Sequence, residues 1–140
     1  MNPDQRLIQI AESLSIPRVH RHIFLCADQT NPKCAPRGET NRLWVHLKSR
    51  LKQLEATSAP PEWQGDMEHE PEPVEPGTGT VLRTKADCLR ICEQGGIAVV
   101  YPEGTWYANL DLEKLDRIID EHLIAGRPVD ELSFVVGDLK

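Results

Sequence analysis

Four cysteines constrain this chain more than any other feature. Cys26 and Cys34 are separated by seven residues, and Cys88 and Cys92 by three. In a reducing compartment, such a set more often binds metal or performs redox chemistry than forms structural disulfides. The N-terminus lacks the pattern of a signal peptide, and no apolar run approaches the ~20 residues that cross a bilayer. We therefore expect a cytoplasmic protein, away from the membrane, whose cysteines hold a metal or carry out redox work.

Length and charge limit the domain count and the partners. A chain of 140 residues has room for a single domain with one hydrophobic core. Lys and Arg number 16 against 22 Asp and Glu, for a formal net charge of -6. Nucleic acids and anionic membranes both attract basic surfaces, so the acidic balance argues against either as the main partner.

The first half of the chain alternates helix and strand. Asn2 can cap a short amphipathic helix, which ends at Ser15-Ile16-Pro17, and the β-favouring run His20–Cys26 follows as a strand. Residues 27–38 contain two prolines and a glycine, which predicts a loop. The next helix is predicted over about 39–55 from the apolar spacing of Leu43, Leu47, Leu51 and Leu54.

The second half adds strands to the same sheet. A strand is predicted over about 80–84, and strands 97–101 and 105–108 flank a hairpin turn at Pro102-Glu103-Gly104. A final helix begins at Asp111 and ends before Gly126, and residues 132–136 are predicted to be extended. The fold class is therefore α/β, with one mixed β-sheet flanked by helices.

Two segments stand outside this core. Residues 1–17 are predicted to form an N-terminal helical extension, and residues 18–140 the domain itself. Within that domain, residues 57–79 are rich in proline and acidic side chains, which indicates an extended insertion.

All four cysteines lie where strands give way to loops, so two ligand pairs can converge at one edge of the sheet. Four thiolates select zinc or an iron–sulfur cluster. The seven-residue gap is wide for a structural zinc site, whereas the two irons of a 2Fe-2S cluster each require a pair of thiolates. The absence of Cys-x-x-Cys counts against dithiol exchange of the thioredoxin kind. Spacing alone leaves a 2Fe-2S cluster, zinc and thiol chemistry open.

An ordered set of motifs resembles the thioredoxin-like 2Fe-2S ferredoxins. It comprises His22-Ile-Phe-Leu-Cys26, the loop from Cys34 to Gly38, Cys88-Leu-Arg-Ile-Cys92-Glu-Gln-Gly, Val99-Val-Tyr-Pro-Glu-Gly-Thr-Trp-Tyr107, Ile119-Asp-Glu-His-Leu123 and Gly126-Arg-Pro-Val129. Together the motifs cover roughly residues 20 to 130, apart from the 57–79 insertion. Two features depart from the family: Gly95-Gly96 stands where many relatives have Gly-Pro, and the insertion is not part of the family core.

The resemblance implies a thioredoxin-like fold without the thioredoxin dithiol, and one 2Fe-2S cluster per chain bound by Cys26, Cys34, Cys88 and Cys92. It also implies a homodimer. The expected function is that of an electron-transfer protein, not an enzyme, which shuttles one electron between a reductase and an acceptor. The alternatives are an iron–sulfur cluster carrier or redox sensor, and a zinc-stabilised interaction module.

The sequence also suggests roles for the cations near the cysteines, the histidines and the aromatic residues. Lys33, Arg37, Lys85 and Arg90 flank the cysteines and could supply positive potential to the cluster. His20 and His22 lack the Cys-x-His spacing of Rieske ligands. His122 lies on an apolar helix face, which predicts a hydrogen-bonded core histidine. Trp44, Tyr101, Trp106 and Tyr107 are expected in the core or at a dimer interface.

Overall fold

The computed structural model describes residues 2–60 and 75–137, so residues 61–74 of the expected insertion lie outside the described residues. In chain order the elements are α1 (Pro3–Ser13), the 3₁₀ turn η1 (Ile16–Arg18), β1 (Arg21–Cys26), α2 (Arg37–Gln53), β2 (Val81–Ala86), β3 (Ala98–Tyr101), β4 (Thr105–Tyr107), α3 (Leu112–Arg117), the π-helical η2 (Ile118–Ile124), the 3₁₀ turn η3 (Asp130–Leu132) and β5 (Ser133–Val136). None of the helices in the described part of the chain is long and apolar enough to span a bilayer.

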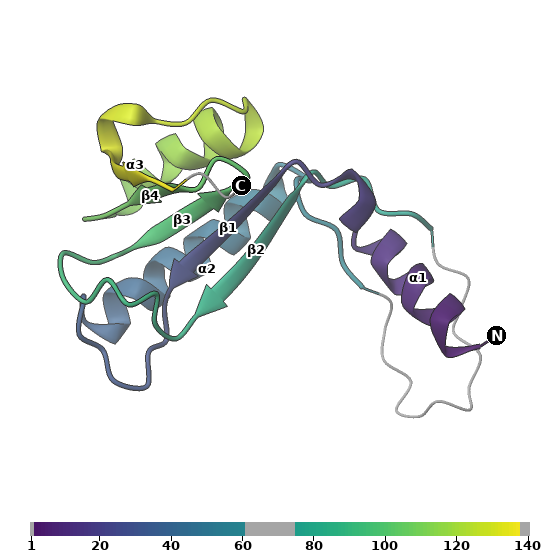
Figure 1. The fold of residues 1–140 in the computed structure, drawn as a ribbon, viewed down its shortest axis with the longest axis horizontal. Coiled ribbons are helices and arrows are strands. Elements are labelled where there is room, and N and C mark those ends of the chain that lie inside the picture. The colour runs from purple at the N-terminus through teal and green to yellow at the C-terminus, as the bar shows by residue number, and fades with distance from the viewer. Residues whose placement is uncertain (1, 61–74, 138–140) are drawn as a thin grey trace.

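The five strands form one mixed sheet in the order β2-β1-β3-β4-β5 (Figure 1). β1 and β2 are parallel and run in register from Arg21 opposite Val81 to Cys26 opposite Ala86. The other neighbouring strands are antiparallel, and β3 and β4 form the expected hairpin. The predicted α/β class with a mixed sheet is confirmed.

The hydrophobic core lies between the sheet and the helices α2, α3 and η2. Ile23 and Leu25 of β1 are completely buried, and their side chains alternate with His22 and Phe24 on the other face of the sheet. Leu47 and Leu51 of α2 are buried in the same core, as predicted. Leu54 was expected to extend that stripe, but α2 ends at Gln53 and the Leu54 side chain is 43% exposed.

The last helix differs from the single regular helix expected there. The Asp111 side chain caps it by accepting a hydrogen bond from the Lys114 N–H at 2.8 Å. After Arg117 the helix widens into η2, which ends with the Ala125 N–H donating to the Asp120 carbonyl, five residues earlier. η2 buries two adjacent pairs of side chains: Ile118, Ile119, His122 and Leu123.

His122 is a fully buried, hydrogen-bonded histidine, as the sequence predicted. The Tyr107 hydroxyl accepts the Val129 N–H at 3.0 Å and lies 2.8 Å from His122 Nδ1. The hydroxyl therefore donates to Nδ1, and Nε2–H donates to Glu103 Oε1 at 2.8 Å. Burial lowers the pKa of His122 and raises the pKa of Tyr107 to about 12. Both side chains are thus neutral near pH 7, which suits this chain of donors and acceptors.

The described ends of the insertion meet beside α1, which stands away from the sheet (Figure 1). The Gly79 N–H donates to the Ser58 hydroxyl at 2.8 Å, and the Gly77 N–H donates to the Glu12 carbonyl at 2.8 Å. The Thr80 N–H reaches the Ala56 carbonyl at 2.9 Å. The chain therefore leaves the core and returns to it at neighbouring positions.

We predict that Tyr107→Phe lowers the free energy of unfolding by about 1–3 kcal/mol, because it leaves the buried His122 and Val129 groups without a partner. Urea denaturation followed by circular dichroism measures the change. Tyr101→Phe is the control, since that ring is only half-buried and keeps its edge contact with Phe24. Equal losses in the two variants would contradict a stabilising role for the buried network.

Candidate metal centre

All four cysteines line one cavity at an end of the sheet. Cys26 is the last residue of β1, Cys34 lies in the loop before α2, and Cys88 and Cys92 lie in the loop between β2 and β3. Because β1 and β2 are parallel, both loops leave the same edge of the sheet. The cavity measures about 160 Å³, and its other lining residues are Gln29, Asn31, Lys33, Asp87 and Ile91.

The inner pair of cysteines has a spacing that suits metal ligands. Cys26 Sγ lies 3.8 Å from Cys34 Sγ. Two sulfurs bound to one tetrahedral metal at about 2.3 Å lie about 3.8 Å apart, so this pair matches that geometry. Cys88 lies near enough to Cys92 to raise the pKa of its thiol, and these two cysteines form the second pair.

The pairs differ in their exposure. Cys26 is buried and Cys34 half-buried, whereas Cys88 and Cys92 are exposed, and all four thiols are free. Among the described residues, no group of three or more histidine, cysteine, aspartate or glutamate side chains is arranged to hold a single metal ion. The four sulfurs are thus brought together as two pairs around the cavity.

Two of the four thiols have a pKa raised above the ordinary value for cysteine. Burial raises the pKa of Cys26, and its neighbour Cys34 acts in the same direction. The pKa of the exposed Cys92 thiol is raised by partial loss of solvation and by Cys88. Metal binding requires thiolates, and a bound cation offsets both burial and the repulsion within each pair.

Backbone contacts hold the cysteine loops against each other. The Gly95 N–H donates to the Cys34 carbonyl at 2.9 Å, and Cys26 Sγ lies 3.8 Å from the Asp87 carbonyl. Arg90 has a φ of 69°, and its N–H donates to Cys88 Sγ at 3.2 Å. Main-chain donors to sulfur stabilise negative charge on it.

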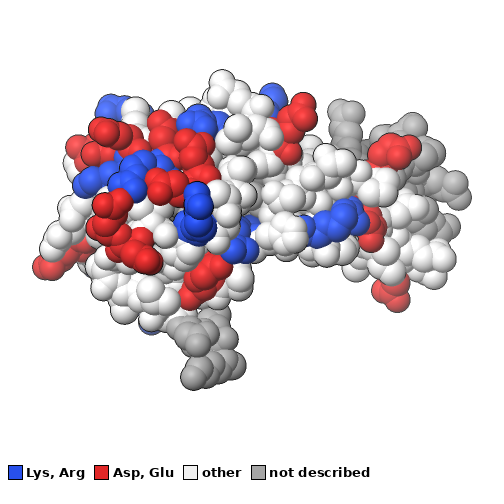
Figure 2. Space-filling model, turned by 90° about the horizontal axis from the view of Figure 1, so that it is seen from above, with Lys and Arg blue, Asp and Glu red and all other residues white. Residues whose placement is uncertain are grey.

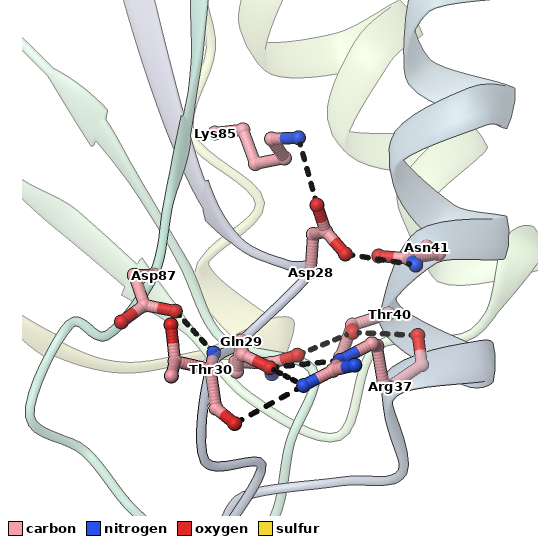
Figure 3. A network of polar contacts seen from close by, with 8 residues as sticks. All are labelled: Asp28, Gln29, Thr30, Arg37, Thr40, Asn41, Lys85 and Asp87. Carbon is pink, nitrogen blue, oxygen red and sulfur yellow. Dashed lines mark hydrogen bonds and ion pairs between the residues drawn. The ribbon is translucent and has the colours of Figure 1, made fainter.

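Two of the four cations expected near the cysteines, Arg37 and Lys85, bind groups of the neighbouring loop (Figure 3). Lys33 lines the cavity. Arg37 donates from Nε to the Gln29 carbonyl at 2.8 Å, and from its guanidinium to the Thr30 carbonyl at 3.1 Å. Lys85 pairs with Asp28 at 3.3 Å. Arg37 and Lys85 therefore fasten the loop that carries Cys34.

The histidines of the first strand do not line the cavity. The His22 ring stacks on Phe24 with centroids 4.1 Å apart, and its Nε2 lies 2.7 Å from the Thr84 hydroxyl. Gln29 was missed at the sequence level: it is buried beside the cysteines, with its Nε2 3.4 Å from both Cys26 Sγ and Cys34 Sγ. No spacing rule marks a single glutamine within a loop.

Comparisons with known proteins relate the chain to one group. No family model matches it. It is 40% identical over 58 residues to a 2Fe-2S ferredoxin of Aquifex aeolicus, covering 41% of this chain and 52% of the relative. It is also 40% identical over 52 residues to a 2Fe-2S ferredoxin of Clostridium pasteurianum, covering 37% and 51%. The chain thus spans about half the length of the curated relatives it matches.

The fold has solved counterparts. A thioredoxin-like [2Fe-2S] ferredoxin from Aquifex aeolicus superposes with a TM-score of 0.58 at 24% identity, covering 86% of this chain and 96% of that one. The wild-type structure solved at 1.5 Å gives the same score at 22% identity, covering 84% and 98%. The thioredoxin-like fold and the resemblance to this family, both predicted from the sequence, are confirmed.

We predict that Gly95→Ala lowers metal affinity by roughly 10–100-fold, the usual effect of disturbing the residues that support metal ligands. An added Cβ would lie 2.7 Å from Cys34 Sγ and 2.9 Å from the Cys34 carbonyl carbon, so the Cys34 loop must shift. Metal analysis of the purified variants measures the effect. Gly38→Ala is the control, because nothing lies within 4 Å of its added Cβ. Full metal content in Gly95→Ala would contradict the role given to this close approach.

Proposed function

We propose that this chain, related to the thioredoxin-like 2Fe-2S ferredoxins, is an electron-transfer protein that carries one 2Fe-2S cluster. Cys26, Cys34, Cys88 and Cys92 are the proposed ligands. The observation that carries the proposal is the gathering of four free thiols as two pairs around one cavity. The 3.8 Å separation of Cys26 Sγ and Cys34 Sγ supports the assignment of that pair to one metal.

The proposed cluster supplies reversible one-electron chemistry, and no substrate is transformed. The exposed Cys88 and Cys92 place one side of the site at the surface, where a redox partner can approach closely. Ile91, 39% exposed between them, offers an apolar contact for that partner. We therefore propose that a reductase and an acceptor dock over the loop from Cys88 to Cys92.

The charged side chains on the face seen in Figure 2 do not form a single acidic patch. On the face seen in Figure 2, acidic and basic side chains are interspersed. Charged side chains of the described residues also form ion pairs, as Arg50 does with Asp116 at 3.0 Å and Asp120 at 2.7 Å. The net charge of -6 still favours a basic partner at long range, and this attraction weakens as salt rises.

The exposure of Cys88 and Cys92 also suits the main alternative, a carrier that hands its cluster to another protein. A stable cluster that is reduced and reoxidised by one electron without loss of iron supports the electron carrier. Transfer of iron and sulfide to an acceptor apoprotein supports the alternative.

We propose a homodimer that forms through the open face of the sheet. Apolar and aromatic side chains share this face, and in Figure 1 no described helix lies in front of β1, β2 and β3. The members with exposed surface are His22, Phe24, Tyr101, Trp106 and Val135, and Val99 lies among them but is only 2% exposed. Homodimer interfaces are more apolar than the rest of a protein surface. In a two-fold dimer the same face of each copy packs against the other, so a second copy would offer the same apolar and aromatic side chains.

We further propose that the protein works in the cytoplasm, where its four thiols stay reduced until they bind metal. The domain is proposed to span residues 18–140, with residues 1–17 as a helical extension and 57–79 as an insertion. The meeting of Ser58 with Gly79 supports this division.

We predict that the wild-type protein contains about two irons and two acid-labile sulfides per chain. Cys88→Ser removes one of four ligands, so its iron content and visible absorption should fall sharply. Ile91→Ser is the matched control, since it changes a cavity residue of the same loop without removing a thiolate. A colourless wild-type protein with one zinc per chain would contradict the proposal and establish the zinc-stabilised module.

We predict that Val135→Asp converts the dimer to a monomer, because it buries a charge in the proposed interface. Val45→Asp is the control: Val45 is 59% exposed on α2, in the opposite layer, against 49% for Val135. Light scattering after size-exclusion chromatography measures the mass of each variant. A dimeric Val135→Asp protein, or a monomeric wild type, would contradict this interface.

A further inference from the structure

Gln29 is the one side-chain amide buried among the proposed cluster ligands in the described part of the chain. Its residue is only 3% exposed. Nε2 lies 3.4 Å from Cys26 Sγ and 3.4 Å from Cys34 Sγ, within hydrogen-bonding distance of a sulfur. One amide nitrogen carries two hydrogens, so it can donate to both sulfurs of the inner pair at once.

The chemistry of the neighbours fixes the orientation of this amide. A thiolate can accept a hydrogen bond but cannot donate one, so the NH₂ group must face the two sulfurs. On the opposite side, Oε1 accepts from the Thr40 hydroxyl at 2.9 Å, and this hydroxyl shares its single hydrogen with the Arg37 carbonyl at 3.1 Å. Thr40 is itself completely buried, so this hydroxyl is shielded from competition by water.

The main chain of Gln29 is held as firmly as its side chain (Figure 3). The Arg37 guanidinium donates to the Gln29 carbonyl and to the Thr30 carbonyl. The Thr30 N–H donates to Asp87 Oδ1, which belongs to the loop of the second cysteine pair. Gln29 is therefore anchored at both ends before any metal binds, and its donors need little reorganisation to meet developing charge.

We propose that Gln29 is a positioning residue that donates one N–H to each of the Cys26 and Cys34 thiolates and thereby raises the reduction potential of the site. This inference rests on the proposed function. Reduction adds one electron, and no proton, to a centre that is already negative. Donors to its sulfurs stabilise the added charge more than they stabilise the oxidised state.

The test is an EPR-monitored redox titration of the cluster-containing protein and its variants. Gln29→Leu removes both donors. At a fixed solution potential we expect the ratio of oxidised to reduced protein to rise about tenfold, which corresponds to a reduction potential lower by about 59 mV for one electron. Thr40→Val releases Oε1 and should shift the potential in the same direction by less. The double variant should match Gln29→Leu alone, because Thr40 acts through Gln29.

Gln53→Leu is the matched control, since Gln53 is an exposed amide in the last turn of α2 and does not line the cavity. Its potential should equal that of the wild type. An unchanged potential in Gln29→Leu, or the same shift in Gln53→Leu, would overturn the inference and leave the proposed function intact. If the Gln29→Leu variant does not hold a cluster, the Thr40→Val variant alone provides the test. A reduction potential below that of the wild type supports the inference, and an unchanged potential overturns it. A wild-type protein without iron and sulfide would overturn both proposals.

Discussion

The parallel pairing of β1 with β2 is the constraint on which the candidate site depends. It places Cys26 opposite Ala86, so the chain leaves both strands at the same edge and Cys88 follows only two residues later. Parallel strands cannot be joined by a tight turn, which leaves α2 and the insertion to make the crossover. A one-residue slip in this register would turn Cys26 to the other face of the sheet and separate the two pairs.

The core and the site share the same elements but satisfy different demands. The side chains of Tyr107 and His122 hydrogen-bond each other and further groups inside the fold, which rigidifies the helical layer beneath the sheet. At the site, burial and a neighbouring thiol raise the pKa of Cys26, and Cys88 contributes to raising the pKa of Cys92, so these two thiols favour the protonated state. The polar groups of the core are thus paired with one another, whereas the four thiols at the end of the sheet are free for the proposed cluster.

Periodicity and capping residues were sufficient to predict most of the fold. Asn2 and Asp111 cap helices as expected, and the hairpin turns at Pro102-Glu103-Gly104. The widening of the last helix into η2 was not predictable, because α- and π-helices present similar apolar spacings over two turns. Leu54 fits the helical repeat, but α2 ends one residue before it, and apolar spacing does not mark that boundary.

For the site, the position of the cysteines at the ends of strands predicted that the four thiols would converge. It did not predict which other side chains surround them. Arg37 and Lys85 were named from the sequence as candidate sources of positive potential, and the structure adds that their hydrogen bonds fasten the loop 28–30. Gln29 hydrogen-bonds Thr40 in the first turn of α2, and a contact between one loop residue and one helix residue leaves no pattern in a single sequence.

The most direct test of the central claim is the EPR spectrum of the dithionite-reduced protein, with spins counted against iron. A 2Fe-2S cluster held by the four cysteines gives one unpaired electron for every two irons, and the signal disappears on reoxidation. A protein that is EPR-silent after reduction, with its iron absent or unchanged in oxidation state, would contradict the account.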